Sequence, residues 1–209
     1  MALKVCLVED DREIRQLLSD LILSSGQFDF LGGFETAEDM IRAFQKLQPD
    51  VVLMDLQLPG RDGTECIREL KIKRPETQFL VCTVFEDNES IYDALLAGAT
   101  GYLLKSSDSK NIIDAIHSVA RGESPMSGII ARKVIESMAT RKKATEYYEK
   151  LTEREREIVE YLSKGYRYKE IAAKLNLSTE TVRTHIRNVY DKLQVGTRTE
   201  AMNKIYGNL

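Results

Sequence analysis

The chain has 209 residues, of which 43% are hydrophobic and 30% are charged, and its formal net charge at pH 7 is −3. This is the composition of an ordinary globular protein, and the length predicts one or two domains. No apolar run approaches the roughly 20 residues that span a bilayer. The first ten residues, MALKVCLVED, are too short and too acidic a stretch for a signal peptide.

Three scattered cysteines lack pair or metal spacing, so we interpret them as small buried residues of a cytoplasmic protein: Cys6, Cys66 and Cys82.

Charge is distributed unevenly along the chain. Residues 1–121 carry 21 acidic and 13 basic residues, whereas residues 149–209 carry 9 acidic and 12 basic residues. An acidic front and a mildly basic back are typical of two domains with different partners. The basic excess is too small to establish nucleic-acid binding by itself.

Strand and helix patterns alternate five times over residues 1–121. Short apolar runs predict strands at 4–9, 28–34, 51–55, 78–83 and 101–104. Apolar residues at helical spacing predict helices at 12–24, 36–47, 63–73, 88–97 and 108–121. Strict alternation favours a parallel sheet with helices on both faces, so we expect a five-stranded, doubly wound α/β domain. The sequence has no glycine-rich phosphate loop of the GxGxxG or GxxxxGK(S/T) kind, so a nucleotide-binding fold is not indicated.

Four of the predicted strands end in polar residues. The first ends in Glu9 and Asp10, the third in Asp55, the fourth in Thr83, and Lys105 follows the fifth. Each residue alone has an ordinary structural interpretation, as a helix cap, a turn former, a strand former or a surface charge. The carboxyl ends of parallel strands lie along one edge of a sheet, where ligands and chemistry are found. Their joint occurrence at these positions therefore indicates a functional site.

The charges and donor atoms of these side chains limit the functions that the site can have. Three carboxylates close together raise one another's pKa unless a cation neutralises them. A hard divalent ion held by carboxylates, a backbone carbonyl and waters is the natural solution, and Mg²⁺ fits. Lys105 and the hydroxyl of Thr83 can then bind an anion attached to Asp55. An acid, a metal, a cation and a hydroxyl on one rim favour phosphoryl transfer, with catalysis by positioning and charge neutralisation.

Residues 1–121 resemble the receiver domains of two-component response regulators, which have a flavodoxin-like fold. The resemblance is carried by LVEDD, VLMDLQLPGRDG, VCTVFED and GYLLK. It implies that Asp55 accepts a phosphoryl group from a sensor histidine kinase. It also implies that Glu9 and Asp10 position Mg²⁺, with Asp55 and the backbone carbonyl of Gln57 completing the protein ligands.

The same resemblance assigns three further residues. Lys105 would pair with a phosphoryl oxygen, Thr83 would move to hydrogen-bond the phosphoryl group, and Tyr102 would swing inward behind it. Many receivers have proline after this lysine, whereas Ser106 stands here. The isomer of the bond between Lys105 and Ser106 is therefore open, because a cis bond is costly without proline.

The strand–helix alternation ends after residue 121. The stretch GESPMSG is rich in turn formers, and apolar spacing then predicts a helix over 129–139. The polar stretch that follows reads as a linker, so we place a linker with a helix at 122–147. Its basic triplet, residues 141–143, is either a solvated face or an auxiliary phosphate contact.

Residues 148–209 predict a small all-α domain. Thr152, with Glu155 three residues later, forms a capping box for a helix that ends near residue 164. Further helices are predicted at 169–175, 178–193 and 197–206. A short helix, a tight turn and a longer capped helix make a helix-turn-helix pattern.

The third of these helices separates two faces. One is an apolar stripe, and the other is polar and contains Arg183, Thr184 and Arg187. The polar face is either simply solvated or the reading face of a recognition helix in the major groove. In the second case arginine can bond guanine and threonine can touch a base edge.

This segment resembles the LuxR-type DNA-binding domain, through LTEREREIVEYLSKGYRYKEIAAKLNLSTETVRTHIRNVYDKL. By the family pattern, Arg183, Thr184 and Arg187 would face bases. Candidates for contacts with phosphate or backbone are Thr179, Thr181, Lys192 and Arg198. The last helix often serves as a dimer contact in relatives.

We therefore expect a cytoplasmic response regulator of the NarL/FixJ type with a receiver domain at 1–121 and a DNA-binding domain at 148–209. It would regulate transcription after phosphorylation and bind promoter DNA as a dimer. It would not be an enzyme, except that the receiver catalyses its own phosphorylation and dephosphorylation.

One alternative is an aspartyl-phosphate phosphatase of the haloacid-dehalogenase kind. That family needs Asp-x-Asp, and here Gln57 stands in the second position. The other alternative is a DNA-binding protein whose receiver is only a dimerising scaffold.

Overall fold

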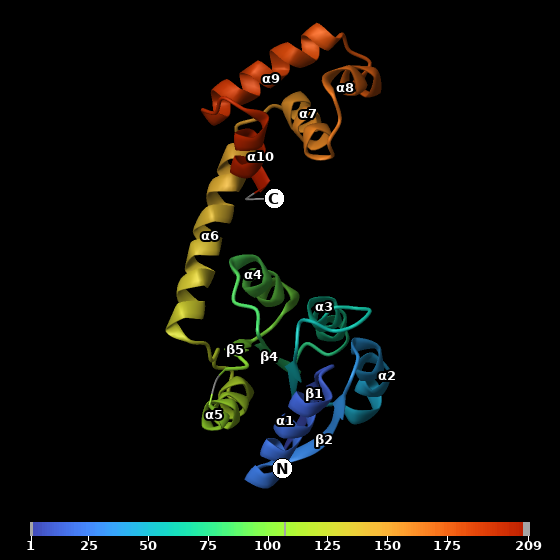
Figure 1. The fold of residues 1–209 in the computed structure, drawn as a ribbon, viewed down its shortest axis with the longest axis vertical. Helices are drawn as coiled ribbons and strands as arrows, with labels where there is room; N and C mark the ends of the chain where they lie inside the picture. The colour runs from blue at the N-terminus through green and yellow to red at the C-terminus, as the bar shows by residue number, and fades with distance from the viewer. Residues whose placement is uncertain (1, 107, 207–209) are drawn as a thin grey trace. The chain divides into compact units, whose positions relative to one another are not determined.

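The computed structural model describes residues 2–106 and 108–206 (Figure 1). The chain divides into two compact units, Met1–Ile135 and Glu136–Leu209. All described peptide bonds are trans, including the bond that precedes Ser106. Within the described ranges, no helix is both long and apolar enough to cross a membrane.

The first unit is built on a five-stranded parallel sheet with the strand order β2-β1-β3-β4-β5. Its strands are β1 (Leu3–Val8), β2 (Phe28–Phe34), β3 (Val51–Met54), β4 (Gln78–Thr83) and β5 (Gly101–Leu104). Its helices are α1 (Arg12–Ser25), α2 (Ala37–Leu47), α3 (Gly63–Lys73), α4 (Asn88–Ala97) and α5 (Ser109–Ala120). The predicted doubly wound α/β fold is confirmed, and each predicted element appears with its ends shifted by no more than one residue.

Alternate strand residues divide this unit into two apolar layers. Val5 and Leu7 of β1 pack with α1 and α5, whereas Cys6 and Val8 pack with α2, α3 and α4. Figure 1 shows these two groups of helices on opposite sides of the sheet. All four residues of β3 are fully buried, which explains why its sequence is continuously apolar rather than alternating. The three cysteines are buried as predicted, and burial raises the pKa of each thiol to about 12.

The segment after α5 also belongs to the first unit. The N–H of Tyr102 on the edge strand β5 donates to the carbonyl of Pro125 at 3.0 Å, and Tyr102 forms a parallel bridge with Met126. Helix α6 (Gly128–Glu149) then buries Ile130 completely in the layer that holds α2, α3 and α4. The compact unit consequently extends beyond residue 121, because this segment covers the exposed edge of β5.

Helix α6 is longer than the sequence predicts. Helical spacing suggested a helix over 129–139 and a polar linker after it, but the helix continues to Glu149. The polar residues after 139 are almost all exposed. They show no apolar periodicity because little of that stretch is buried. The spacing of apolar residues therefore does not predict this part of the helix.

The second unit contains α7 (Glu153–Ser163), α8 (Tyr168–Leu175), α9 (Thr179–Leu193) and α10 (Arg198–Tyr206). Thr152 and Glu155 form the predicted capping box, and Ser178 caps α9 through the backbone N–H of Thr181. Asn176 adopts the left-handed conformation that ends α8 before the turn into α9. The apolar stripe of α9 is buried in the core of this unit, which confirms the helix-turn-helix prediction: Val182, Ile186, Val189 and Leu193.

The neighbouring residues Ile129 and Ile130 test whether the start of α6 stabilises the first unit. Ile130 is fully buried, whereas Ile129 is 64% exposed. We expect Ile130→Ala to lower the free energy of unfolding of the first unit by about 2–5 kcal/mol, because it leaves a cavity in the core. Ile129→Ala should change it by less than about 0.5 kcal/mol. Urea denaturation followed by circular dichroism measures both, and equal effects would contradict the assignment of this segment to the core.

Candidate functional sites

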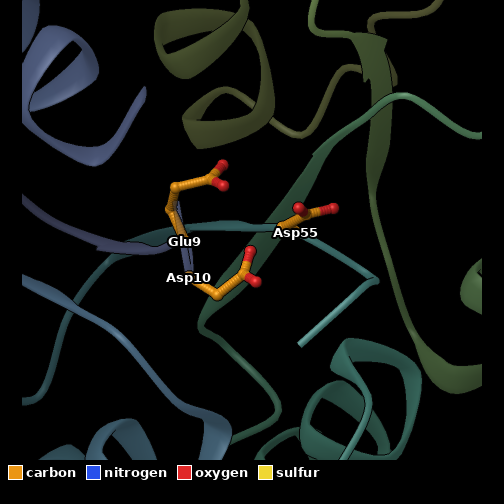
Figure 2. A group of neighbouring side chains, drawn as sticks. All are labelled: Glu9, Asp10 and Asp55. Carbon is orange, nitrogen blue, oxygen red and sulfur yellow. The ribbon is translucent and has the colours of Figure 1, made fainter. Parts of the chain in front are cut away.

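Three carboxylates meet at the carboxyl edge of the sheet, between β1 and β3 (Figure 2). Glu9 and Asp10 follow β1, and Asp55 follows β3, at the point where the strand order reverses. One oxygen from each carboxylate lies within 4.8 Å of the other two. The side chains of Glu9 and Asp55 are only 1% and 4% exposed, whereas Asp10 is exposed. The structure thus brings together the three acids that the sequence singled out.

Lys105 reaches this cluster from the end of β5. Its Nζ lies 2.7 Å from Asp55 Oδ2 and 2.7 Å from Glu9 Oε2. Burial alone would lower the pKa of Lys105, but its hydrogen bonds to Asp55 and Glu9 outweigh burial and raise it. Burial raises the pKa of Glu9 even though Lys105 opposes the shift. The ammonium is consequently charged at neutral pH and ties two of the three acids together.

The residues present fit a hard divalent cation. One ammonium cannot neutralise three carboxylates, and the donor atoms are oxygens, which Mg²⁺ prefers. Asp10 is exposed and can supply the open side of such a site. Gln57, the predicted carbonyl ligand, lies at the rim, and its backbone N–H donates to Asp55 Oδ1 at 3.3 Å. The acidic cluster is therefore suited to hold a cation beside the Asp55 carboxylate.

Thr83 and Tyr102 are the other two residues that the sequence assigns to this site, and both are buried. Thr83 ends β4, next to β3, and its side chain is fully buried. Among the described residues its Oγ1 has no hydrogen-bond partner, which is costly for a buried hydroxyl. Tyr102 is also fully buried, in the inward position, and its hydroxyl donates to the carbonyl of Phe85 at 3.0 Å. Burial raises the pKa of Tyr102 above its usual value, so the phenol stays protonated.

Two positively charged residues near this site were not found from the sequence. Arg15 of α1 donates to the backbone carbonyls of Glu9 and Asp10. Lys133 of α6 donates to the backbone carbonyl of Glu86, in the loop between β4 and α4. Both of these contacts end on a backbone carbonyl, which every residue type has, so the identity of the acceptor residue does not reveal them.

The predicted base-facing residues lie on the exposed face of α9. The side chain of Arg183 is 60% exposed and lies 3.4 Å from Glu180, an ion pair that solvent weakens. The hydroxyl of Thr184 donates to the carbonyl of Glu180 within the same helix at 3.1 Å. Arg187 is exposed and forms no ion pair within residues 2–106 and 108–206. Two arginines of α9 are therefore available to a partner.

Three of the four predicted phosphate-contact residues are engaged within the second unit. Lys192 Nζ lies 2.6 Å from Oε2 of the buried Glu155, and the guanidinium of Arg198 donates to the carbonyl of Leu162. The hydroxyl of Thr181 lies 2.8 Å from that of Ser178, the cap of α9. The contacts of Lys192 and Arg198 hold α9 and α10 against α7, and that of Thr181 lies within the cap of α9. A role in phosphate contact stays a prediction for all three.

Thr179, the fourth of these residues, lines a hollow on the second unit together with Arg183 and Arg198. The hollow has a volume of about 670 Å³ and is also lined by Arg167, Tyr168, Lys169 and Glu170. Its four cationic side chains outnumber its single acid. Arg167 and Lys169 at the start of α8 were not singled out from the sequence, although their basic charge beside the helix-turn-helix was visible there.

A pair of buried threonines tests whether the hydroxyl of Thr83 is held without a partner. Thr83 and Thr77 are both fully buried, but the hydroxyl of Thr77 donates to the carbonyl of Pro49 at 2.8 Å. We expect Thr83→Val to raise the free energy of unfolding by about 1 kcal/mol, and Thr77→Val to lower it by about 1 kcal/mol. Chemical denaturation measures both changes, and a loss of stability in Thr83→Val would show that its hydroxyl is satisfied.

Comparison with known sequences places both units in families. The response regulator receiver domain matches residues 5–117, and the bacterial regulatory proteins of the luxR family match residues 149–205. Response regulator protein VraR of Staphylococcus aureus is 36% identical over 203 residues, which make up 97% of this chain and 95% of VraR.

Solved structures agree with this assignment. The response regulator ChrA of a heme-sensing two-component system is 28% identical, has a TM-score of 0.56 and aligns over 97% of this chain and 96% of its own. RcsB of Salmonella typhimurium aligns over 96% of this chain and 98% of its own with a TM-score of 0.69, and at 21% identity this is a likeness of fold. The matches span both units, so the chain belongs to the two-component response regulators that join a receiver domain to a LuxR-type DNA-binding domain.

Proposed function

We propose that the chain accepts a phosphoryl group on Asp55 from a sensor histidine kinase, and that this transfer controls its binding to promoter DNA. The observation that carries the proposal is the setting of Asp55. Its carboxylate lies 2.7 Å from Lys105 and beside two further acids, and the neighbouring strand β4 ends in Thr83, whose hydroxyl is buried without a partner among the described residues. A carboxylate so surrounded is suited to become an acyl phosphate, because each neighbour has a role once the phosphoryl group is attached.

The transfer step follows from these positions. An oxygen of Asp55 attacks phosphorus, the P–O bond forms as the P–N bond to the kinase histidine breaks, and the histidine nitrogen keeps the electron pair. Mg²⁺ held by Glu9, Asp10 and Asp55 would supply charge neutralisation on the phosphoryl oxygens. Lys105 then pairs with one phosphoryl oxygen, and the Thr83 hydroxyl donates to another. Such a contact would give Thr83 the hydrogen-bond partner that it otherwise lacks.

Phosphorylation would act as a switch because the carboxylate of Asp55, with one negative charge, becomes an acyl phosphate with nearly two and with three acceptor oxygens. The contacts of Lys105 and Thr83 would favour one of two receiver conformations. The loop after β4 is the segment best suited to respond, since Tyr102 binds the carbonyl of Phe85 and Lys133 binds the carbonyl of Glu86.

We propose that α9 is the recognition helix and that the active form binds DNA as a homodimer. Support comes from the exposed Arg183 and Arg187 and from the basic hollow beside them. RcsB is a structural relative that has been solved bound to promoter DNA. Paired recognition helices would contact half-sites about one DNA turn apart.

We further propose that the chain is not an enzyme toward external substrates. Phosphatases that use an aspartyl phosphate need a second acid two residues after the nucleophile, and Gln57 stands at that position. Assays with small phosphomonoesters test this, and turnover above the rate of an Asp55→Asn variant would contradict it.

Light scattering in Mg²⁺, with and without beryllofluoride, tests the switch. Beryllofluoride on a carboxylate mimics an acyl phosphate, so we expect it to convert the wild-type protein from monomer to dimer. Asp55→Asn should remain monomeric because it lacks the carboxylate that beryllofluoride needs. The proposal is contradicted if both proteins keep one mass and one DNA affinity, and a receiver that acts only as a scaffold would then be favoured.

Substitution of Arg187 and of Lys192, five residues apart on α9, should affect two different properties: promoter binding and stability. Arg187→Met should weaken promoter binding about tenfold, which corresponds to losing one arginine contact to a base, and should leave stability unchanged. Lys192→Met should destabilise the second unit, on the order of 1–3 kcal/mol, because Glu155 is left buried without its partner. Fluorescence anisotropy with promoter DNA and thermal denaturation separate the two effects. Equal loss of stability in both variants would refute this division of roles.

A further inference from the structure

We propose that Arg15 is a positioning residue for the divalent cation: its guanidinium fixes the backbone from which Glu9 and Asp10 extend toward the cation. This inference rests on the proposed binding of Mg²⁺ at the acidic cluster. Arg15 itself does not touch the cation in this proposal. It acts through the two acids, as residues that orient metal ligands do.

The contacts of Arg15 converge on the turn that carries the acids. Its Nη1 donates to the carbonyl of Glu9 at 2.6 Å and to the carbonyl of Asp10 at 2.9 Å. Its Nη2 lies 3.2 Å from Glu35 Oε2, which anchors the other end of the guanidinium. The side chain is only 18% exposed, so these bonds are largely sheltered from water. Two consecutive carbonyls held by one rigid group cannot rotate independently.

This turn needs such a partner because the sheet no longer supports it. The paired residues of β1 end at Val8, whose carbonyl accepts the N–H of Asp55 at 3.0 Å. The N–H of Glu9 still reaches the carbonyl of Phe34 at 2.9 Å. Beyond this point the carbonyls of Glu9 and Asp10 lie outside the ladder, and Arg15 supplies their donors. The acids are thereby placed by a side chain rather than by strand pairing.

Helix α1 also holds the segment that carries the two acids. Asp11 caps α1 by accepting from the N–H groups of Glu13 and Ile14 at 2.8 and 3.0 Å. Arg15 lies one turn further along the same helix and reaches back over the cap. The segment 9–11 is therefore tied to α1 at its end and along its backbone.

The effect of Arg15 on the cation is geometric rather than electrostatic. A bare guanidinium near the site would repel a divalent cation, and the carboxylate of Glu35, 3.2 Å away, offsets part of that charge. Gly33 of β2 leaves room for the stem of Arg15, since a Cβ there would lie 3.2 Å from Arg15 Cγ. A lysine would be a poor substitute because a single ammonium lacks the planar fork that binds two carbonyls and a carboxylate together.

The test compares Mg²⁺ affinity of the full chain by isothermal titration calorimetry for the wild type, Arg15→Gln, Arg15→Lys and Arg12→Gln. Arg12→Gln is the matched control, because Arg12 is an exposed arginine at the start of the same helix. We expect affinity to fall 10- to 100-fold in Arg15→Gln. It should fall by an intermediate factor in Arg15→Lys and change less than about twofold in Arg12→Gln.

Two further measurements keep the interpretation unambiguous. The titration is repeated in 0.5 M KCl, because salt would screen an electrostatic effect whereas a geometric one persists. Circular dichroism without Mg²⁺ reports whether each variant folds, and Arg15→Lys carries the test if Arg15→Gln does not. A wild-type protein that fails to bind Mg²⁺ would overturn the proposed metal site. A wild type that binds while Arg15→Gln or Arg15→Lys matches the control would overturn the role of Arg15 alone.

Discussion

The main constraint on the first unit is the negative charge that is concentrated at one edge of its sheet, because this charge is unfavourable unless other groups compensate for it. Glu9 and Asp55 are buried there, and Asp10 lies beside them. Such a group is stable only if cations and donors surround it, which explains the buried position of Lys105 at 2.7 Å from two of the acids. The backbone of the acidic turn, which lies beyond the paired part of β1, is held from outside the sheet by Arg15.

The loop after β4 connects this edge to the beginning of α6. Thr83 lies at its start with a hydroxyl that has no partner among the described residues. Two consecutive carbonyls of the loop are bound from outside it, that of Phe85 by Tyr102 and that of Glu86 by Lys133. This loop is therefore tied both to the edge strand β5 and to the first turns of α6, within the first unit.

In the second unit, cationic side chains of similar type serve different purposes. Lys192 and Arg198 hold the helices together through Glu155 and the carbonyl of Leu162. Arg183 and Arg187 lie on the solvent face of α9, where Arg183 has only a solvent-exposed ion pair. The division follows from geometry: the end of α9 packs against α7, whereas its middle turns project two arginines away from the core. Charge alone therefore does not identify residues that contact nucleic acid.

Apolar periodicity and turn chemistry are local, so they are enough to predict the alternation of strands and helices, the helix-turn-helix and the residues at the strand ends. From these it also predicted that Glu9, Asp10, Asp55 and Lys105 share one edge, since parallel strands end together. The continuation of α6 to Glu149 and the place of its start in the first unit could not be predicted in this way. Nor could the polar groups that meet across long sequence distances, as when Arg15 binds two carbonyls and Lys192 binds Glu155. The reason is physical: periodicity records which face of an element is buried, but a hydrogen bond to a distant backbone carbonyl leaves no mark on the sequence of its acceptor.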